Sequence, residues 1–179
     1  MKNLVFLISF ISLNIFSQSK YITKTGVVNF EASVPSFEEV SAKNNATTAI
    51  LNTDNGEFAA LVLVKGFRFK NALMEEHFNE NYAESDKFPK ATFKGIILDL
   101  NLGLLGSKTN LIMKGELSFH GKIKSLNNIP ITLTKENGII KMTGKLTVKT
   151  SDFDIKIPKI VKTKVSESVN ITFVFDLKS

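Results

Sequence analysis

The sequence predicts an all-β fold, an antiparallel β-barrel of about eight strands with one short inserted helix. Runs of alternating apolar and polar residues recur along the chain, as expected for strands buried on one face. Turn-forming pairs such as Asn137-Gly138 separate several of these runs. One stretch differs, because Asn71 can cap a helix, good helix formers follow it, and Pro89 prevents the helix from continuing.

The 179 residues suffice for one domain with its own core, and we expect residues 18–179 to form it. Residues 1–17 have the pattern of a secretory signal peptide, with Lys2 before an apolar run and the small residue Ser17 at the cleavage point. The run over 4–16 is too short to span a bilayer as a helix, although an uncleaved anchor is the alternative. The expected localisation is therefore periplasmic or secreted.

Before the helix, residues 27–34 alternate as a strand, and a polar stretch over 43–45 precedes a weaker strand over 46–52. The sequence Asp-Asn-Gly at 54–56 then predicts a hairpin turn. The next strand, over 58–64, is apolar on both faces. We expect the helix to cover its outer face, and a homodimer contact there is the alternative.

After the helix, alternation predicts the remaining strands over 92–98, 111–120, 123–134, 140–148 and 169–177. The Gly-rich piece over 102–106 is expected to be a loop with exposed leucines. Residues 113–119 and 142–148 match position by position, and each places a Gly, at 115 and 144, on the inward face. Such glycines permit the bends that close a barrel, although chance similarity between two alternating strands explains the repeat equally well.

Composition limits the function. The formal charge is +6, but 22 of the 23 basic residues are lysines and Arg68 is the only arginine. Nucleic-acid recognition normally relies on arginine, so we expect no nucleic-acid partner and at most peripheral membrane contact. The chain has no cysteine, which removes disulfides and thiol chemistry.

Catalytic and metal-binding signals are weak. His77 and His120 are the only histidines, with His77 expected on the helix and His120 on the outward face of a strand. Without cysteines or a clustered carboxylate pair they make a poor metal site. Nothing matches a nucleophile elbow, a phosphate loop or a zinc-protease helix. We therefore expect neither an enzyme nor a metal.

The inward face is apolar, and the residues alone leave two interpretations open. It is either an ordinary packed core or a long ligand tunnel. The tunnel would be lined by Phe30, Phe93, Met113, Leu117, Phe119, Met142, Leu146, Ile171, Phe173 and Phe175. Arg68 would stand at its mouth, beside Lys70 and Asn71, where a guanidinium could bind a pyrophosphate head group.

Several segments carry a further pattern. It consists of aromatic residues at the end of the helix, a Lys-Phe-Pro sequence before the next strand, two strand regions that contain Gly, and the last strand. The segments are His77-Phe78, Tyr82, 86–93, 115–122, 144–148, 152–155 and 165–171. Together they resemble the YceI-like family of exported, lipocalin-like proteins that bind polyisoprenoids, over about 27–177. Thr25-Gly26-Val27 and residues 73–75 depart from the family's polar pairs, which bear on the ligand head group rather than on the fold.

The resemblance implies a lipocalin-like barrel and favours the cavity. Our leading hypothesis is an exported protein that sequesters or carries an isoprenoid or other long-chain lipid, such as a quinone or a polyprenyl phosphate. It would need no cofactor other than the bound lipid. The alternatives are a secreted interaction protein with a solid barrel, contacting its partner through residues 102–105 or the helix face, and, less favoured, an enzyme acting on a lipid.

Overall fold

The computed structural model describes residues 19–35, 37–105 and 108–179, so the expected signal peptide at 1–17 lies outside the described residues. The strands are β1 (Lys20–Ser33), β2 (Ser41–Asn52), β3 (Glu57–Leu63), β4 (Arg68–Phe69), β5 (Lys90–Ile97), β6 (Thr109–Phe119), β7 (Lys122–Glu136), β8 (Ile139–Lys149) and β9 (Val165–Lys178). The helix α1 spans Ala72–His77 and continues as a wider turn over Phe78–Tyr82. Short 3-10 turns lie at Val64–Gly66, Leu102–Leu104, Thr150–Phe153 and Lys159–Val161.

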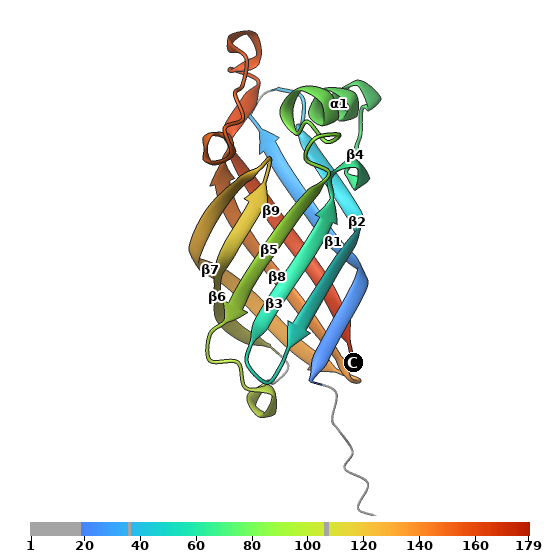
Figure 1. Ribbon diagram of the computed structural model, residues 1–179, viewed down its shortest axis with the longest axis vertical. Helices are drawn as coiled ribbons and strands as arrows, with labels where there is room; N and C mark the ends of the chain where they lie inside the picture. Colours follow the sequence, from blue (N-terminus) through green and yellow to red (C-terminus); the bar gives the residue numbers. More distant parts are fainter. Residues whose placement is uncertain (1–18, 36, 106–107) are drawn as a thin grey trace, which may run out of the picture.

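The strands form one antiparallel sheet that closes on itself, as expected (Figure 1). In the order β1-β9-β8-β7-β6-β5-β3-β2, the last strand pairs again with β1. The short β4 adds two residues to β2 at the upper end. β7 and β8 pair only between Ile131–Glu136 and Ile139–Gly144, so the upper parts of these two strands are not paired with each other. The closed sheet turns one face of each strand inward, where the apolar residues are buried.

The two hairpin turns predicted from Asn-Gly sequences are confirmed. Gly56 lies between β2 and β3 with φ of 76°. Asn137 and Gly138 join β7 to β8 with φ of 49° and 76°, the left-handed pair that a tight two-residue hairpin requires. The Asn71 cap is also confirmed, because its side-chain oxygen accepts hydrogen bonds from the Leu73 and Met74 amides at 2.9 and 3.4 Å.

The first two strands begin earlier than the sequence predicted. β1 starts at Lys20, where Tyr21 and Thr23 point inward and are buried. β2 starts at Ser41, so the stretch expected to be a polar connection is strand. Asn44 in that stretch is buried because its amide donates to the Leu63 carbonyl at 3.0 Å and its oxygen accepts from the Ala46 amide at 2.8 Å. A polar residue with all its groups paired does not interrupt a strand.

Two expectations about covering segments were wrong. The helix does not cover the outer face of β3, since Leu63 there is 52% exposed; it contacts β4 and lies across the upper barrel end. The loop after β5 does not expose Leu102 and Leu105, which pack against the buried core. Asn101 holds this loop in place, because its side-chain oxygen accepts from the Gly103 amide at 2.9 Å. That segment lies at the lower end, away from α1 (Figure 1).

The core occupies the lower half of the barrel. Its fully buried members include Leu51, Leu133, Ile140, Met142 and Leu177. Packed side chains therefore fill the lower half, which confines any internal space to the upper half.

No helix among the described residues is long and apolar enough to cross a membrane.

Candidate functional site

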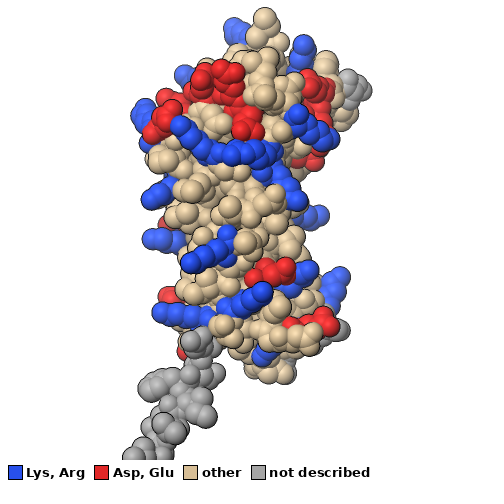
Figure 2. All heavy atoms as spheres, turned by 90° about the vertical axis from the view of Figure 1, so that its right-hand side faces the viewer, with Lys and Arg blue, Asp and Glu red and all other residues tan. Residues whose placement is uncertain are grey.

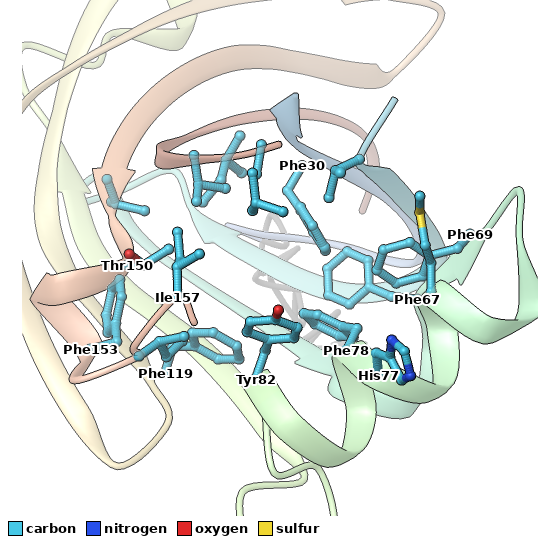
Figure 3. Close-up of a pocket in the computed structure, with 18 of the residues that line it drawn as sticks. Phe30, Phe67, Phe69, His77, Phe78, Tyr82, Phe119, Thr150, Phe153 and Ile157 are labelled. Carbon is cyan, nitrogen blue, oxygen red and sulfur yellow. The ribbon is translucent and has the colours of Figure 1, made fainter. Parts of the chain in front are cut away.

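The upper half of the barrel encloses an apolar cavity of about 380 Å³ beneath α1 and the β8–β9 connection (Figure 3). Its walls are inward residues of six strands together with the helix and that connection. Wall residues are Val28, Phe30, Ala32, Val62, Ala91, Leu117, Phe119, Val148, Val169 and Ile171, and covering residues include Phe67, Phe69, Met74, Phe78, Tyr82, Phe153, Ile155, Ile157 and Val161. Because nearly all of these are hydrocarbon side chains, the cavity suits an apolar ligand.

An aromatic cluster forms one side of the cavity. Phe30 of β1 packs against Phe67, Phe69 and Phe78, with ring centroids 5.1, 5.7 and 5.2 Å apart. The rings come from three places in the chain, and edge contacts dominate the Phe30 pairs with Phe67 and Phe69. This packing attaches the helix end to the barrel wall and gives the cavity a rigid aromatic side.

A layer of phenylalanine rings, each packed against a glycine, closes the cavity from below. The Phe173 ring lies where a Gly144 Cβ would stand, with ring atom Cε2 2.8 Å from that position. Phe175 lies on Gly26 in the same way, at 2.8 Å for Cε1, and stacks on Phe173 at 5.3 Å. The missing side chains therefore make room for large rings across the barrel.

The third ring, Phe93, is seated on Gly115, with its Cζ 2.6 Å from that residue's absent Cβ. Gly115 pairs with Gly95 across β5 and β6, and the β6–β7 register shifts just before it. The prediction that Gly115 and Gly144 face inward is supported by this packing. That these glycines also leave room for aromatic rings of neighbouring strands is seen only in the folded structure.

The structure divides the predicted tunnel residues between the two halves. Phe30, Leu117, Phe119 and Ile171 line the cavity. Phe93, Met113, Met142, Phe173 and Phe175 are buried in the packed half, and Leu146 packs against them. The apolar face is therefore cavity above and core below, and does not form a tunnel along the whole barrel.

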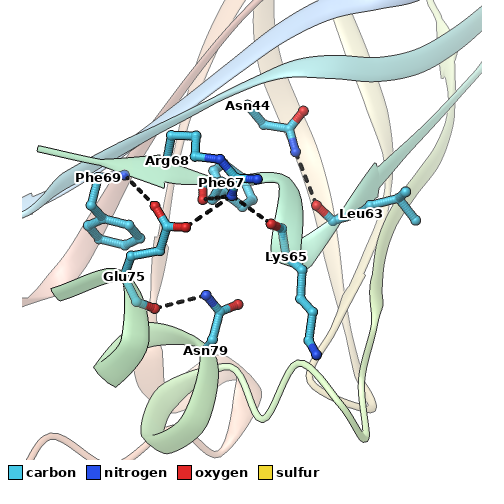
Figure 4. Close-up of polar contacts among 8 residues, drawn as sticks. All are labelled: Asn44, Leu63, Lys65, Phe67, Arg68, Phe69, Glu75 and Asn79. Carbon is cyan, nitrogen blue, oxygen red and sulfur yellow. Dashed lines mark hydrogen bonds and ion pairs between the residues drawn. The ribbon is translucent and has the colours of Figure 1, made fainter. Parts of the chain in front are cut away.

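Arg68 does not line the cavity. Its Nη1 donates to Glu75 Oε1 at 3.0 Å and to the carbonyls of Lys65 and Phe67 at 2.8 and 3.0 Å (Figure 4). The other oxygen of Glu75 accepts from the Phe69 amide at 3.1 Å. The arginine thus ties β4 to α1, and the adjacent carboxylate offsets its charge.

Sequence reasoning missed Tyr82 as a site residue. Its ring lies between Phe119 and Phe78, and its hydroxyl points into the cavity (Figure 3). The described residues supply no hydrogen-bond partner for that hydroxyl, so it is a polar group free to meet a ligand. The signal was present, because Met74, Phe78 and Tyr82 repeat at four-residue spacing on one side of the helical segment.

The other polar residues at the cavity stand at its mouth and are exposed, apart from half-buried Thr150. They are Glu38, His77, Lys149, Thr150 and Lys164. No group of three or more His, Asp or Glu side chains gathers as a metal site in the described part of the chain. Apart from the Tyr82 hydroxyl, the polar groups are thus at the entrance, and the interior is apolar.

Two sets of polar contacts anchor the start of the β8–β9 connection. Asp152 accepts from Lys124 Nζ at 2.8 Å and from the Lys149 amide at 2.9 Å, and both interactions lower the pKa of its carboxyl group. Asp154 pairs with Lys122 at 2.7 Å, and that hydrogen bond lowers the pKa of Asp154. Both carboxylates attach the turn to the start of β7.

His120 joins the two covering segments to each other. It was expected on an outward strand face, but β6 ends before it and it sits in the turn with φ of 49°. Its Nδ1 donates to the Phe153 carbonyl at 2.9 Å, and its Nε2 lies 2.7 Å from Glu84 Oε2. One half-buried ring therefore connects the segment after α1 with the β8–β9 connection.

Comparison with known proteins agrees with this architecture. A polyisoprenoid binding domain from Saccharophagus degradans is 14% identical with a TM-score of 0.76, covering 90% of this chain and 98% of that one. BcnA of Burkholderia cenocepacia is 19% identical with a TM-score of 0.68, covering 85% and 94%. The YCEI protein of Campylobacter jejuni is 14% identical with a TM-score of 0.53, covering 99% and 94%. At these identities the likeness shows a shared fold.

A search of curated proteins finds no match to the chain. The family model described as YceI-like domain, in contrast, matches residues 20–177, which is nearly the whole of the described barrel. That span includes β1 to β8, β9 except its last residue, and both segments that cover the cavity. The chain therefore belongs to the YceI-like domain family.

Proposed function

We propose that this protein is an exported carrier that holds the apolar chain of an isoprenoid lipid in the upper cavity and performs no covalent chemistry. The observation that carries the proposal is the apolar cavity of about 380 Å³, with its polar groups gathered at the mouth. The Saccharophagus degradans domain of similar fold, described as polyisoprenoid binding, supports the ligand class. The signal-like residues 1–17 support export to a periplasm or to the exterior.

The floor sets the direction of binding. Because Phe93, Phe173 and Phe175 close the barrel below the cavity, a chain entering from the mouth cannot pass through to the other end. The tail would therefore bind first and the head group would remain near Tyr82, Thr150 and the exposed mouth residues. A volume near the lower limit for small-molecule sites favours a short isoprenoid chain or the end of a longer one.

The rival functions have less support. A wholly solid barrel is contradicted by the cavity, and Leu102 and Leu105, the expected partner contacts, pack against the core instead. An enzyme would need titratable groups within the walls. Glu38 is the only acidic residue at the cavity in the described part of the chain, and it is exposed at the mouth.

Filling the cavity tests the proposal. Ala91 points into it from β5, so Ala91→Phe should occupy the ligand's space, whereas Ala59→Phe on the outer face of β3 adds the same bulk outside. We would express the full chain in a Gram-negative host and analyse organic extracts of the periplasmic protein by mass spectrometry. Uptake of added farnesol would be measured on the same samples.

A stoichiometric isoprenoid in the wild-type and Ala59→Phe extracts, and its loss with Ala91→Phe at unchanged melting temperature, is the expected result. Equal farnesol uptake by all three proteins would refute binding in this cavity. Intact mass tests export independently, because a processed protein begins at Gln18.

A further inference from the structure

The connection between the Thr150–Phe153 turn and β9 has an unusual two-sided pattern over residues 155–164, here called the mouth loop. Ile155, Ile157 and Val161 line the cavity. Between them, Lys156 and Lys159 are exposed, and Ile160 is 86% exposed, more than any other large apolar residue in the described part of the chain. One short segment thus presents apolar side chains both inward and outward.

The mouth loop rises beyond the end of the barrel beside α1 and forms the top of the molecule in Figure 1. Exposed apolar residues stand on the neighbouring segments of the same end, with Leu73 of α1 at 57% and Phe37 before β2 at 48% exposure. Apolar groups are therefore exposed where the cavity opens.

The charge of the mouth loop is of one sign. It holds four lysines and no Asp or Glu. Lys162 pairs with Glu167 at 3.0 Å, whereas Lys156 and Lys159 form no ion pair within the described residues. Elsewhere the charges are mixed, and Figure 2 shows Lys and Arg spread along the barrel wall, with the largest groups of Asp and Glu near the upper end and smaller ones in the lower half.

We propose that the mouth loop docks on an anionic lipid bilayer, with Ile160 entering the headgroup layer and Lys156 and Lys159 contacting lipid phosphates. An apolar tip flanked by lysines is the composition of peripheral membrane anchors. A protein partner would be expected to meet Trp, Tyr or Arg, and the loop has none of these. The bilayer is therefore the occupant that this chemistry fits.

Docking would also act on the cavity. Ile155, Ile157 and Val161 share the loop backbone with Ile160 and the two lysines, so pulling the outer residues toward the bilayer draws the inner ones from the cavity. The mouth would open only where lipid is at hand. This coupling rests on the lipid-carrying function proposed above, but docking itself does not.

Vesicle sedimentation tests docking directly. The exported protein is mixed with vesicles of phosphatidylglycerol and phosphatidylcholine in equal amounts, or of phosphatidylcholine alone. The loop variants are Ile160→Asp and the double variant Lys156→Gln with Lys159→Gln. Matched controls at the lower end are Ile22→Asp and the double variant Lys24→Gln with Lys135→Gln. Each control makes the same change in charge as its loop variant, but at the end of the barrel opposite the mouth. All proteins share one N-terminus, so any contribution of residues 1–17 cancels.

The wild type should sediment with the anionic vesicles and much less with the neutral ones. Losing two lysines should lower the partition constant roughly twenty-five-fold, at about fivefold for each lysine near an anionic surface. Ile160→Asp should lower it by roughly tenfold or more. Added salt should weaken wild-type binding, because screening acts on the lysine part.

Equal sedimentation of loop and control variants, or no wild-type binding to anionic vesicles, would overturn the docking proposal. Farnesol uptake without vesicles separates this outcome from the carrier function. Farnesol uptake without vesicle binding would refute docking alone. Vesicle binding without farnesol uptake would refute the carrier function alone.

Discussion

The packing of the Phe173 ring against Gly144 predicts that substitutions at these two positions have non-additive effects on the free energy of unfolding. In Gly144→Ala the new Cβ would overlap the end of the Phe173 ring, with Cε2 at 2.8 Å and Ile131 Cγ2 at 3.0 Å. Since carbon atoms pack at about 3.5–4.0 Å, the ring must move by more than about 0.7 Å. Overpacking of this kind costs about 1–3 kcal/mol of unfolding free energy.

Phe173→Leu removes the overlapping ring atoms. Alone it should cost about 1–2 kcal/mol, because it leaves space in the packed half. Combined with Gly144→Ala it should cost less than the sum of the single changes by at least about 1 kcal/mol, since the alanine methyl then enters space that the ring has left. Urea unfolding followed by far-UV circular dichroism suits a protein with no tryptophan and two tyrosines.

Gly115 provides the contrast. A Cβ there would overlap the Lys94 carbonyl and lie 2.6 Å from Gly95 Cα, so backbone must yield and not only a ring. Gly115→Ala should therefore cost more than about 3 kcal/mol, and Phe93→Leu should not rescue it. If Gly144→Ala and Phe173→Leu prove additive within about 0.5 kcal/mol, the seating argument is wrong.

Three further predictions concern the contacts at the mouth. His120→Asn keeps a residue that tolerates the positive φ of its turn but removes both ring contacts, so amide exchange at 84–88 and 150–155 should accelerate while the β6–β7 hairpin stays protected. Asp152→Asn should lower the melting temperature near neutral pH. Because the pKa of Asp152 is lowered in the folded protein, the deficit should begin to shrink as pH falls through about 4, the ordinary pKa of an aspartate, and should vanish only below the lowered folded pKa, where the wild-type carboxylate is also protonated. Arg68→Gln should free α1 from β4 and speed exchange at 72–77 without changing the lower-half core.

Each of these has an outcome that contradicts it. For His120→Asn it is unchanged exchange in both covering segments. For Asp152→Asn it is a deficit that persists in acid or is matched by Asp54→Asn, a control in the turn between β2 and β3 without an ion pair in the described structure. For Arg68→Gln it is slow exchange across α1, which would assign the attachment of the helix to the aromatic cluster.

Much of the fold was predictable because the signals are local. Alternation at 140–148, the Asn137-Gly138 turn and the Asn71 cap each depend on neighbours within a few residues, and all appear in the structure. The errors arose where partners lie far apart. Asn44 appeared to be a loop residue because its acceptor, the Leu63 carbonyl, is 19 positions away.

The candidate site was predictable in kind but not in extent. The apolar inner face followed from period-two patterning, which assigns Phe30 and Phe173 alike to the interior. Only packing between neighbouring strands separates them, since the Phe173 ring packs against its paired residue Gly144 and closes the cavity from below, while Phe30 remains on the cavity wall. Tyr82 and His120 likewise acquire their roles from segments distant in the chain.

The sequence by itself determined the strands, their inward faces, the tight turns and the capped helix, because steric and hydrogen-bonding preferences over a few residues specify them. The tertiary structure alone decided that the barrel is solid below and hollow above, that Arg68 braces a helix, and that the loop leucines pack against the core. Volume and charge pairing depend on residues brought together by closure of the sheet. No local pattern contains that information.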